Sequence, residues 1–158
     1  MNGTPEREVL AGLLAAAQRI GTGFDEALEL LAPIPRSPEE FAALGKVQRI
    51  AAAAALKRFE QLQDVLARLL RTALIADGVD VAAMTTRDIA NRMEKVEALP
   101  DAALWSQIVR LRNRLAHEYP QRPGDQFDRL NAVLGHIGAL REVHGSVLAY
   151  LRRQDLVS

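Results

Sequence analysis

The segment that begins at Pro38 constrains the fold most, because the chain then runs to about Ala76 without another proline. Apolar residues recur there at every third or fourth position, which is the period of an α-helix with one buried face. These residues are Ile50, Ala54, Phe59, Leu62, Leu66, Leu69 and Leu70. Gly45 divides this long helix from a short first segment, and Asp77 with Gly78 closes it. A helix of this length needs other helices to cover its apolar face.

A capping threonine followed by proline marks an earlier helix start at Thr4. Its apolar stripe consists of Val9, Leu10, Leu13, Leu14 and Ile20. The sequence Gly21-Thr22-Gly23 is expected to weaken or break this helix, which residues 25–31 could resume. Two prolines that follow residue 32 then end it. Ser37, with Glu40 three residues later, forms a capping box that starts the next segment.

Caps also divide the second half of the chain. Thr85 and Asp88 are expected to cap a helix that runs to about Leu99, after a linker over residues 79–84. Asp101 is expected to cap the next helix, which ends before a break over residues 120–124. The buried face of that helix is predicted to consist of Leu104, Ile108, Leu111 and Leu115.

A last long helix is expected over residues 125–153, where Gly135, Gly138 and Gly145 could let a neighbouring element pack closely. No segment alternates apolar and polar residues as a strand would, and no internal repeat is found. The sequence therefore predicts one domain over residues 1–158, folded as an all-α, up-and-down bundle of four to five helices.

The composition limits the functions that such a bundle could have. Twenty basic residues balance twenty acidic ones, so any attraction for phosphate has to come from a local patch. Only 4% of residues are aromatic, too few for a base-stacking platform. There is no cysteine, which fits a cytoplasmic protein, and neither a secretion signal nor a membrane-spanning run is recognised. His136 and His144 lack a carboxylate at ligand spacing, so no metal site is expected.

A dense polar cluster lies at the end of the helix that Asp101 is expected to begin, between Leu111 and Tyr119. On a regular helix one face would carry Arg110, Asn113, Arg114 and His117. Arg112 would lie about 140° from His117 at 100° per residue, so the two would not meet on one regular helix. They could converge if the helix ends near His117, if Arg112 curls round, or if a second copy faces the first. A simpler interpretation is that the basic residues complement the helix dipole.

The run Arg112-Asn113-Arg114-Leu115-Ala116-His117 has the Arg-x4-His form that marks the HEPN superfamily of helical ribonuclease domains, and the chain resembles that superfamily. With Tyr119 added, the motif resembles that of the HepT-type toxins of bacterial toxin–antitoxin pairs. The segment from Phe59 to Tyr119 more loosely resembles HEPN proteins described as substrate-binding partners of nucleotidyltransferases.

The resemblance implies metal-independent cleavage of RNA, without a cofactor, by attack of the ribose 2′-hydroxyl on the adjacent phosphate. His117 would take or give a proton near neutral pH, and Arg112 would stabilise charge on the phosphoryl oxygens. Asn113 would hydrogen-bond the phosphate or orient His117. Arg110 and Arg114 would bind RNA phosphates, although they could equally be solvated surface charges.

The resemblance also implies partners. Acid–base chemistry normally needs two groups, and the superfamily is known for homodimers that place two motifs across one cleft. In HepT-type toxins of type VII-like systems, a nucleotidyltransferase antitoxin adds AMP to the tyrosine that matches Tyr119. That side chain could instead be a partly buried aromatic closing the helix end. Two other functions stay open: a non-catalytic HEPN partner of a nucleotidyltransferase, and a purely structural helical dimer.

Overall fold

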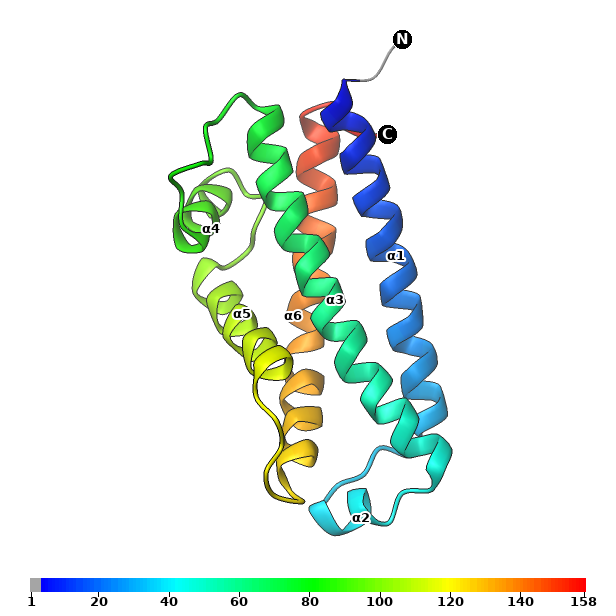
Figure 1. The fold of residues 1–158 in the computed structure, drawn as a ribbon. Coiled ribbons are helices and arrows are strands. Elements are labelled where there is room, and N and C mark those ends of the chain that lie inside the picture. Colours follow the sequence, from blue (N-terminus) through cyan, green and yellow to red (C-terminus); the bar gives the residue numbers. More distant parts are fainter. Residues whose placement is uncertain (1–3) are drawn as a thin grey trace.

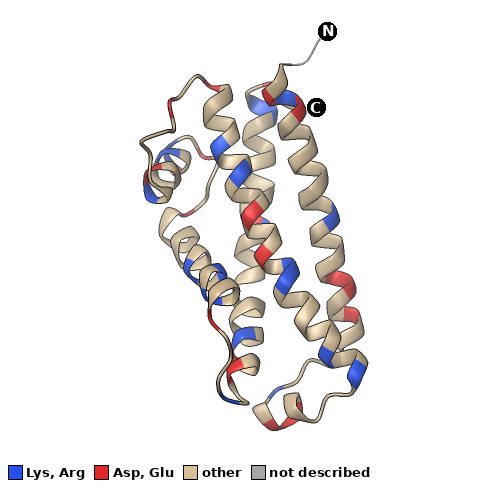
Figure 2. Ribbon diagram, in the orientation of Figure 1, with Lys and Arg blue, Asp and Glu red and all other residues tan. Residues whose placement is uncertain are grey.

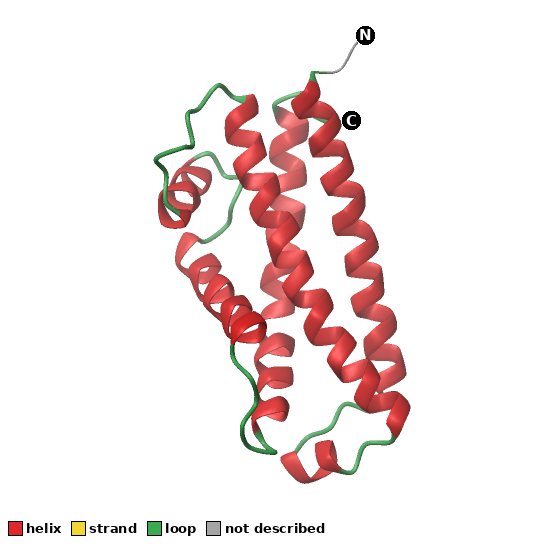
Figure 3. Ribbon diagram, viewed as in Figure 1, coloured by secondary structure: helices red, strands yellow, loops and turns green. Residues whose placement is uncertain are grey.

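The structure is a computed structural model, and it describes residues 4–158. The described chain is entirely helical, with loops and turns but no strand (Figure 3), so the prediction of an all-α fold is confirmed. The helices are α1 (Pro5–Leu31), α2 (Pro38–Ala42), α3 (Lys46–Ala76), α4 (Thr86–Lys95), α5 (Ala102–His117) and α6 (Asp125–Arg153). The described residues thus form six helices rather than four to five, because α2 is a separate five-residue helix.

The long helices form an up-and-down bundle in which α1, α3, α5 and α6 alternate in direction (Figure 1). Helix α3 is the centre of the arrangement, because it packs against α1, α4, α5 and α6. Helices α4 and α5 lie on the opposite side of α3 from α1, and α2 crosses one end of the bundle (Figure 1). The loop between α5 and α6 is at the same end as α2 (Figure 1). The motif segment therefore ends at one end of the bundle.

The predicted caps fix most helix starts. Thr85 and Asp88 form both halves of a capping box, at 2.9 and 3.1 Å. The Ser37 hydroxyl accepts a hydrogen bond from the Glu40 amide at 3.1 Å, as predicted. The Glu40 carboxylate, however, accepts from the Arg36 amide and not from Ser37, so only half of that box forms. Local hydrogen-bonding chemistry thus places these boundaries.

The predicted break at Gly21-Thr22-Gly23 is wrong, because α1 runs without interruption to Leu31. Each glycine costs a helix about 1 kcal/mol relative to alanine. Phe24, however, is fully buried beside this segment, and such burial contributes about 1.5–3 kcal/mol. A Cβ on Gly23 would lie 2.9 Å from the Arg58 Nε of α3, so the glycine leaves room for that side chain. Packing against α3 keeps the helix intact.

Helix α4 ends at Lys95, four residues before the predicted end at Leu99. Glu97 adopts a left-handed conformation with φ of 60° and turns the chain. The amides of Ala98 and Leu99 then both donate to the carbonyl of Met93, at 2.9 and 3.1 Å. This turn buries Ala98 and Leu99, which a continued helix would not do.

The core differs from the predicted apolar faces at several positions. Ile50 and Val9 are exposed, by 61% and 51%, although both were expected in buried stripes. In this part of α3 the buried residues are instead the small residues Ala51, Ala52 and Ala55. The three glycines of α6 have no atom within 4 Å of an added Cβ, so the close packing expected there is absent within the described chain.

Candidate functional site

Helix α5 is oriented by its buried side, and this decides which motif residues face solvent. The Asp101 carboxylate accepts from the Leu104 amide at 3.0 Å and starts the helix. Trp105, Ile108 and Leu111 are at most 2% exposed and hold the helix against the core. The predicted buried face named Leu104 in place of Trp105, but Leu104 is only half-buried. Away from this buried side, Arg110, Arg114 and His117 form an exposed row, and the helix contains no acidic residue.

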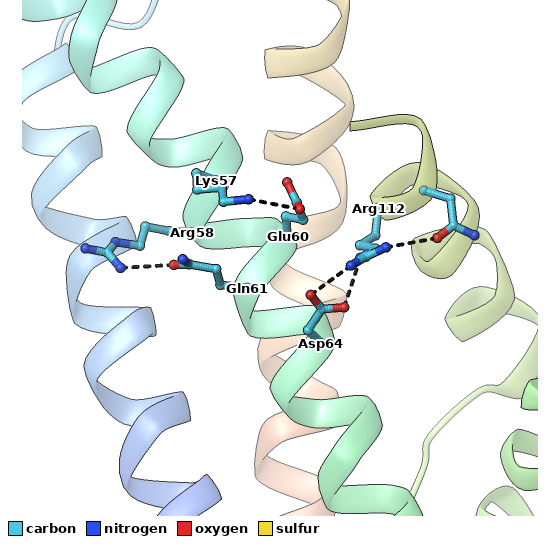
Figure 4. A network of polar contacts seen from close by, with 7 residues as sticks. Lys57, Arg58, Glu60, Gln61, Asp64 and Arg112 are labelled. Atoms are coloured by element: carbon cyan, nitrogen blue, oxygen red, sulfur yellow. Dashed lines mark hydrogen bonds and ion pairs between the residues drawn. The ribbon is translucent and has the colours of Figure 1, made fainter. Parts of the chain in front are cut away.

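Arg112 points away from that exposed row and pairs with Asp64 of α3 (Figure 4). Its Nη2 donates to Asp64 Oδ2 at 2.9 Å, and its Nε lies 2.9 Å from Oδ1. The Nε is buried and has no aligned hydrogen bond there. Nη1 donates to Asn113 Oδ1 at 3.4 Å, so among the described residues Asn113 is tied to Arg112 rather than to His117. The pair holds the guanidinium against α3.

His117 is the last residue of α5, and the chain becomes extended at Glu118. Arg129 of α6 donates from Nη2 to the Glu118 carbonyl at 2.5 Å, which fixes the direction in which the chain leaves the helix. Tyr119 follows with 90% of its surface exposed, so the alternative prediction that it is a partly buried aromatic closing the helix end is wrong. His117 is exposed as well.

A groove of about 680 Å³ lies between the end of α5 and the start of α6. His117 and Tyr119 line it together with three arginines, Arg114, Arg122 and Arg129. Three carboxylates also line the groove, those of Glu118, Asp125 and Asp128. A second hollow of about 330 Å³, towards Lys57 and Glu60 of α3, is lined by His117 and Tyr119 too. The histidine and the tyrosine therefore reach both hollows.

Asp125 organises the loop that forms one wall of this groove. Its Oδ2 accepts from the amides of Arg122 and Gln121, both at 2.9 Å. The hydrogen bonds from these two amides lower the pKa of the Asp125 carboxyl below its usual value. Arg122 Nε lies 3.6 Å from Asp125 Oδ1, so this arginine stays beside the turn. The carboxylate thus stabilises the loop and partly offsets the charge of one groove arginine.

The structure divides the predicted site residues into three places. His117, Arg114 and Tyr119 line the groove. Arg112 lines neither hollow beside His117, although α5 ends at His117, so the helix end does not bring them together. Arg110 lines a separate hollow against α4. Asp64 holds Arg112 away from these hollows, so neither route within one chain is seen, and convergence through a second copy stays a prediction.

Sequence reasoning missed Asp64, Arg122 and Arg129. Asp64 lies forty-eight residues before Arg112, and no local pattern connects the two. The one signal was an acidic residue within the apolar-periodic part of α3, between the buried Leu62 and Leu66. Arg129 reaches the site only because α6 turns back beside α5.

The other histidines have structural surroundings. His136 Nδ1 lies 2.7 Å from the Ala132 carbonyl within α6. His144 is half-buried, and this burial lowers its pKa. Across residues 4–158, no three or more histidine, cysteine or acidic side chains come together in a way that could hold a metal ion. In the same part of the chain, no helix has the length and apolar character to cross a membrane.

Comparisons of the chain with protein-family models, with curated proteins and with solved structures found no match.

Proposed function

We propose that this chain is a metal-independent endoribonuclease, a HEPN toxin of the HepT type, which cleaves RNA in the groove at the end of α5. The observation that carries the proposal is the exposed His117 at the end of the Arg-x4-His motif, in one groove with Arg114, Arg122 and Arg129. A general acid–base group beside several phosphate-binding cations is what RNA transphosphorylation requires. Because its substrate is cellular RNA, we place its action in the cytoplasm.

In the proposed reaction the ribose 2′-oxygen forms a bond to the adjacent phosphorus, and the bond from phosphorus to the 5′-oxygen breaks. His117 accepts the proton of the 2′-hydroxyl, and the leaving 5′-oxygen takes a proton from an acid. The products are a 2′,3′-cyclic phosphate and a 5′-hydroxyl. The groove arginines bind the phosphate and stabilise the negative charge that develops on its free oxygens.

The acid is proposed to come from a second copy of the chain. A single groove contains one histidine, and Arg112 is held on another side of α5 by Asp64. A symmetric homodimer would place His117 and Arg112 of both copies across one cleft. In this arrangement Asp64 is a positioning residue, because it fixes the direction of the Arg112 guanidinium.

The test uses purified protein and a single-stranded RNA. Wild type is expected to release fragments ending in a 2′,3′-cyclic phosphate, and His117→Ala is expected to lose at least a hundredfold in rate. His136→Ala is the matched control, because His136 lies outside both hollows. Added imidazole should restore part of the rate of His117→Ala. Equal cleavage by wild type and His117→Ala would exclude this function.

Tyr119 is the proposed target of a nucleotidyltransferase antitoxin. Its phenol is exposed, and its hydroxyl makes no hydrogen bond to any residue of 4–158. In the modification the phenol oxygen bonds to the α-phosphorus of ATP, pyrophosphate leaves, and the phenol proton goes to solvent or a base. AMP at this position would fill the groove beside His117 and bring negative charge against its arginines.

The chain has two tyrosines, and the second provides an internal control. Tyr150 is buried and donates a hydrogen bond to Asp77, so it should stay unmodified. Intact-mass measurement after coexpression with the proposed nucleotidyltransferase antitoxin, to be sought in the neighbouring open reading frame, should show whole AMP additions, lost in Tyr119→Phe. Absence of any addition, or addition to Tyr150, would contradict the assignment.

The exposure of Tyr119 also favours a second candidate, a non-catalytic HEPN partner that presents a substrate to a nucleotidyltransferase. The two candidate functions predict different effects of the substitution His117→Ala. If the chain is only a partner, His117→Ala leaves the activity of the complex unchanged, and the chain alone cleaves no RNA.

A further inference from the structure

A second basic hollow lies between α4 and α5, away from the groove of His117. It measures about 520 Å³ and is lined by Arg87 of α4 and Arg110 of α5. Asn91 and Gln107 add two amides, and no acidic residue lines the hollow. In the groove at the end of α5, by contrast, three carboxylates face the three arginines. The hollow against α4 is therefore the more strongly cationic of the two.

The two arginines of this hollow are free of intramolecular partners. Within residues 4–158, neither Arg87 nor Arg110 forms an ion pair or a side-chain hydrogen bond, and both are exposed. The carboxylates nearest along the chain already accept hydrogen bonds from backbone amides at the starts of α4 and α5. Asp88 accepts from the Thr85 amide, Asp101 from the Leu104 amide and Glu94 from the Ala102 amide. The guanidinium groups are left for an external anion.

The charge of the molecule is arranged so that this side attracts an anion. The chain has no net charge, yet α5 contains three arginines and no acidic residue. Helix α1, on the far side of α3, contains five acidic residues and two arginines (Figures 1 and 2). A neutral molecule with this separation presents its basic face to a polyanion.

A row of polar residues on the surface of α5 leads from the hollow against α4 to the groove at the end of α5. Arg110, Arg114 and His117 are spaced by four and three residues, so they lie in one row on the helix surface. At a rise of about 1.5 Å per residue, the row extends about 10 Å from Arg110 to His117. A single RNA strand of a few nucleotides spans this length, whereas one bound phosphate does not.

We propose that the hollow formed by Arg87 and Arg110 is a distal subsite for the same single-stranded RNA whose scissile phosphate lies beside His117. The two arginines bind a backbone phosphate. Asn91 and Gln107 each offer a donor and an acceptor, which suits the base or ribose hydroxyl of the nucleotide bound there. This inference rests on the proposed ribonuclease function, and it extends the recognised substrate to a strand longer than the cleaved dinucleotide.

The test measures binding of an RNA of about ten nucleotides, within the range of site sizes for single-strand binders. Every 2′-oxygen carries a methyl group, so the strand is bound but not cleaved. Fluorescence anisotropy at several salt concentrations gives the affinity and its salt dependence. Arg87→Gln with Arg110→Gln is expected to weaken binding about tenfold and to reduce the salt slope by about 0.7, the value for one phosphate contact on a single strand.

The matched control is Arg19→Gln with Arg71→Gln. It removes the same charge from exposed arginines that line neither the groove nor the hollow, and its RNA affinity should stay near wild type. A methylated dinucleotide has a single phosphate, which the proposal places beside His117, so Arg87→Gln should bind it as wild type does.

The outcomes separate the two proposals. If the long strand binds equally to the Arg87 and Arg110 double variant and to the control, the subsite is wrong, whatever the cleavage result. If only vesicles of phosphatidylserine distinguish these variants, the hollow recognises a membrane surface and the RNA subsite is also overturned. If RNA binding depends on the hollow but unmodified RNA is never cleaved, the subsite stands and the ribonuclease function fails. If wild type binds no RNA, both are refuted.

Discussion

The ion pair between Arg112 and Asp64 should contribute measurably to folding stability. The side chains are 22% and 41% exposed and approach through two contacts of 2.9 Å. Fully exposed pairs contribute about 0.2–1 kcal/mol, and this partly buried pair has one charge-assisted hydrogen bond, from Nη2 to Oδ2. Because the Asp64 side chain is 41% exposed, solvent screens its attraction to Arg112. We therefore expect a coupling free energy of about 1 kcal/mol between the two side chains.

A double-mutant cycle measures this coupling. The variants are Asp64→Ala, Arg112→Met and the combination of both, since methionine retains the aliphatic stem of arginine. Unfolding in urea gives the free energy of unfolding of each, and the loss in the double variant should fall about 1 kcal/mol short of the sum of the single losses. The same cycle at high salt should give a smaller coupling.

The pair of Arg7 and Asp155 provides the control, because these side chains are 42% and 95% exposed and 3.5 Å apart. Arg7→Met and Asp155→Asn should couple by only about 0.2 kcal/mol or less. If the cycle of Asp64 and Arg112 gives the same small value, the guanidinium is not held against α3 in solution. Arg112 would then be free to reach the groove of its own chain, and one copy could bring Arg112 and His117 together.

Three further predictions concern the bundle and the loop. Gly21→Ala should raise the free energy of unfolding by about 0.5–1 kcal/mol, since the added Cβ meets no atom within 4 Å in a continuous helix. Burial and the Asp77 carboxylate raise the pKa of Tyr150 from 10.0 to about 12, so its contribution to stability should be complete below pH 10.0 and lost as the pH rises through about 12. Tyr150→Phe should remove this pH dependence in urea titrations. Asp125→Ala should speed hydrogen exchange at the amides of Gln121 and Arg122.

Each of these three predictions has a control variant or a result that would contradict it. Gly78 has a φ of +80°, so Gly78→Ala should destabilise the protein, and a stabilising effect there would refute the conformational argument. A stability that is flat between pH 10.0 and 12 in wild type would contradict the role of Tyr150. Because the Asp125 pKa is lowered, the contribution of that carboxylate should be present above its usual pKa of 3.8 and fall away at lower pH. Unchanged exchange in Asp125→Ala would show that other contacts hold the loop.

Helix positions could be predicted well because their signals are local. The capping residues Thr85 and Asp101 begin α4 and α5 where the sequence indicates. The two errors in helix extent, at Gly21 and at Leu99, have one cause. In both places burial of neighbouring residues in the core outweighs the local preference of the backbone.

The residues of the candidate site could be named from the motif, but their grouping could not. The sequence places Arg112 and His117 about 140° apart on a regular helix, and α5 is regular to its end. It does not say that Asp64 binds Arg112, or that Arg129 of α6 reaches Glu118. Nor does it show that Arg110 faces α4 and shares a hollow with Arg87.

The sequence by itself therefore determined an all-α chain, the starts of its helices and the polar cluster at the end of α5, because caps and helical periods act over a few residues. The tertiary structure decided which of those polar groups meet. Burial of Trp105 and its neighbours fixes the rotation of α5, and the packing of α3, α4 and α6 around that helix gives each of its arginines different surroundings. Contacts between residues far apart in the chain depend on how whole helices pack, and no local pattern records that arrangement.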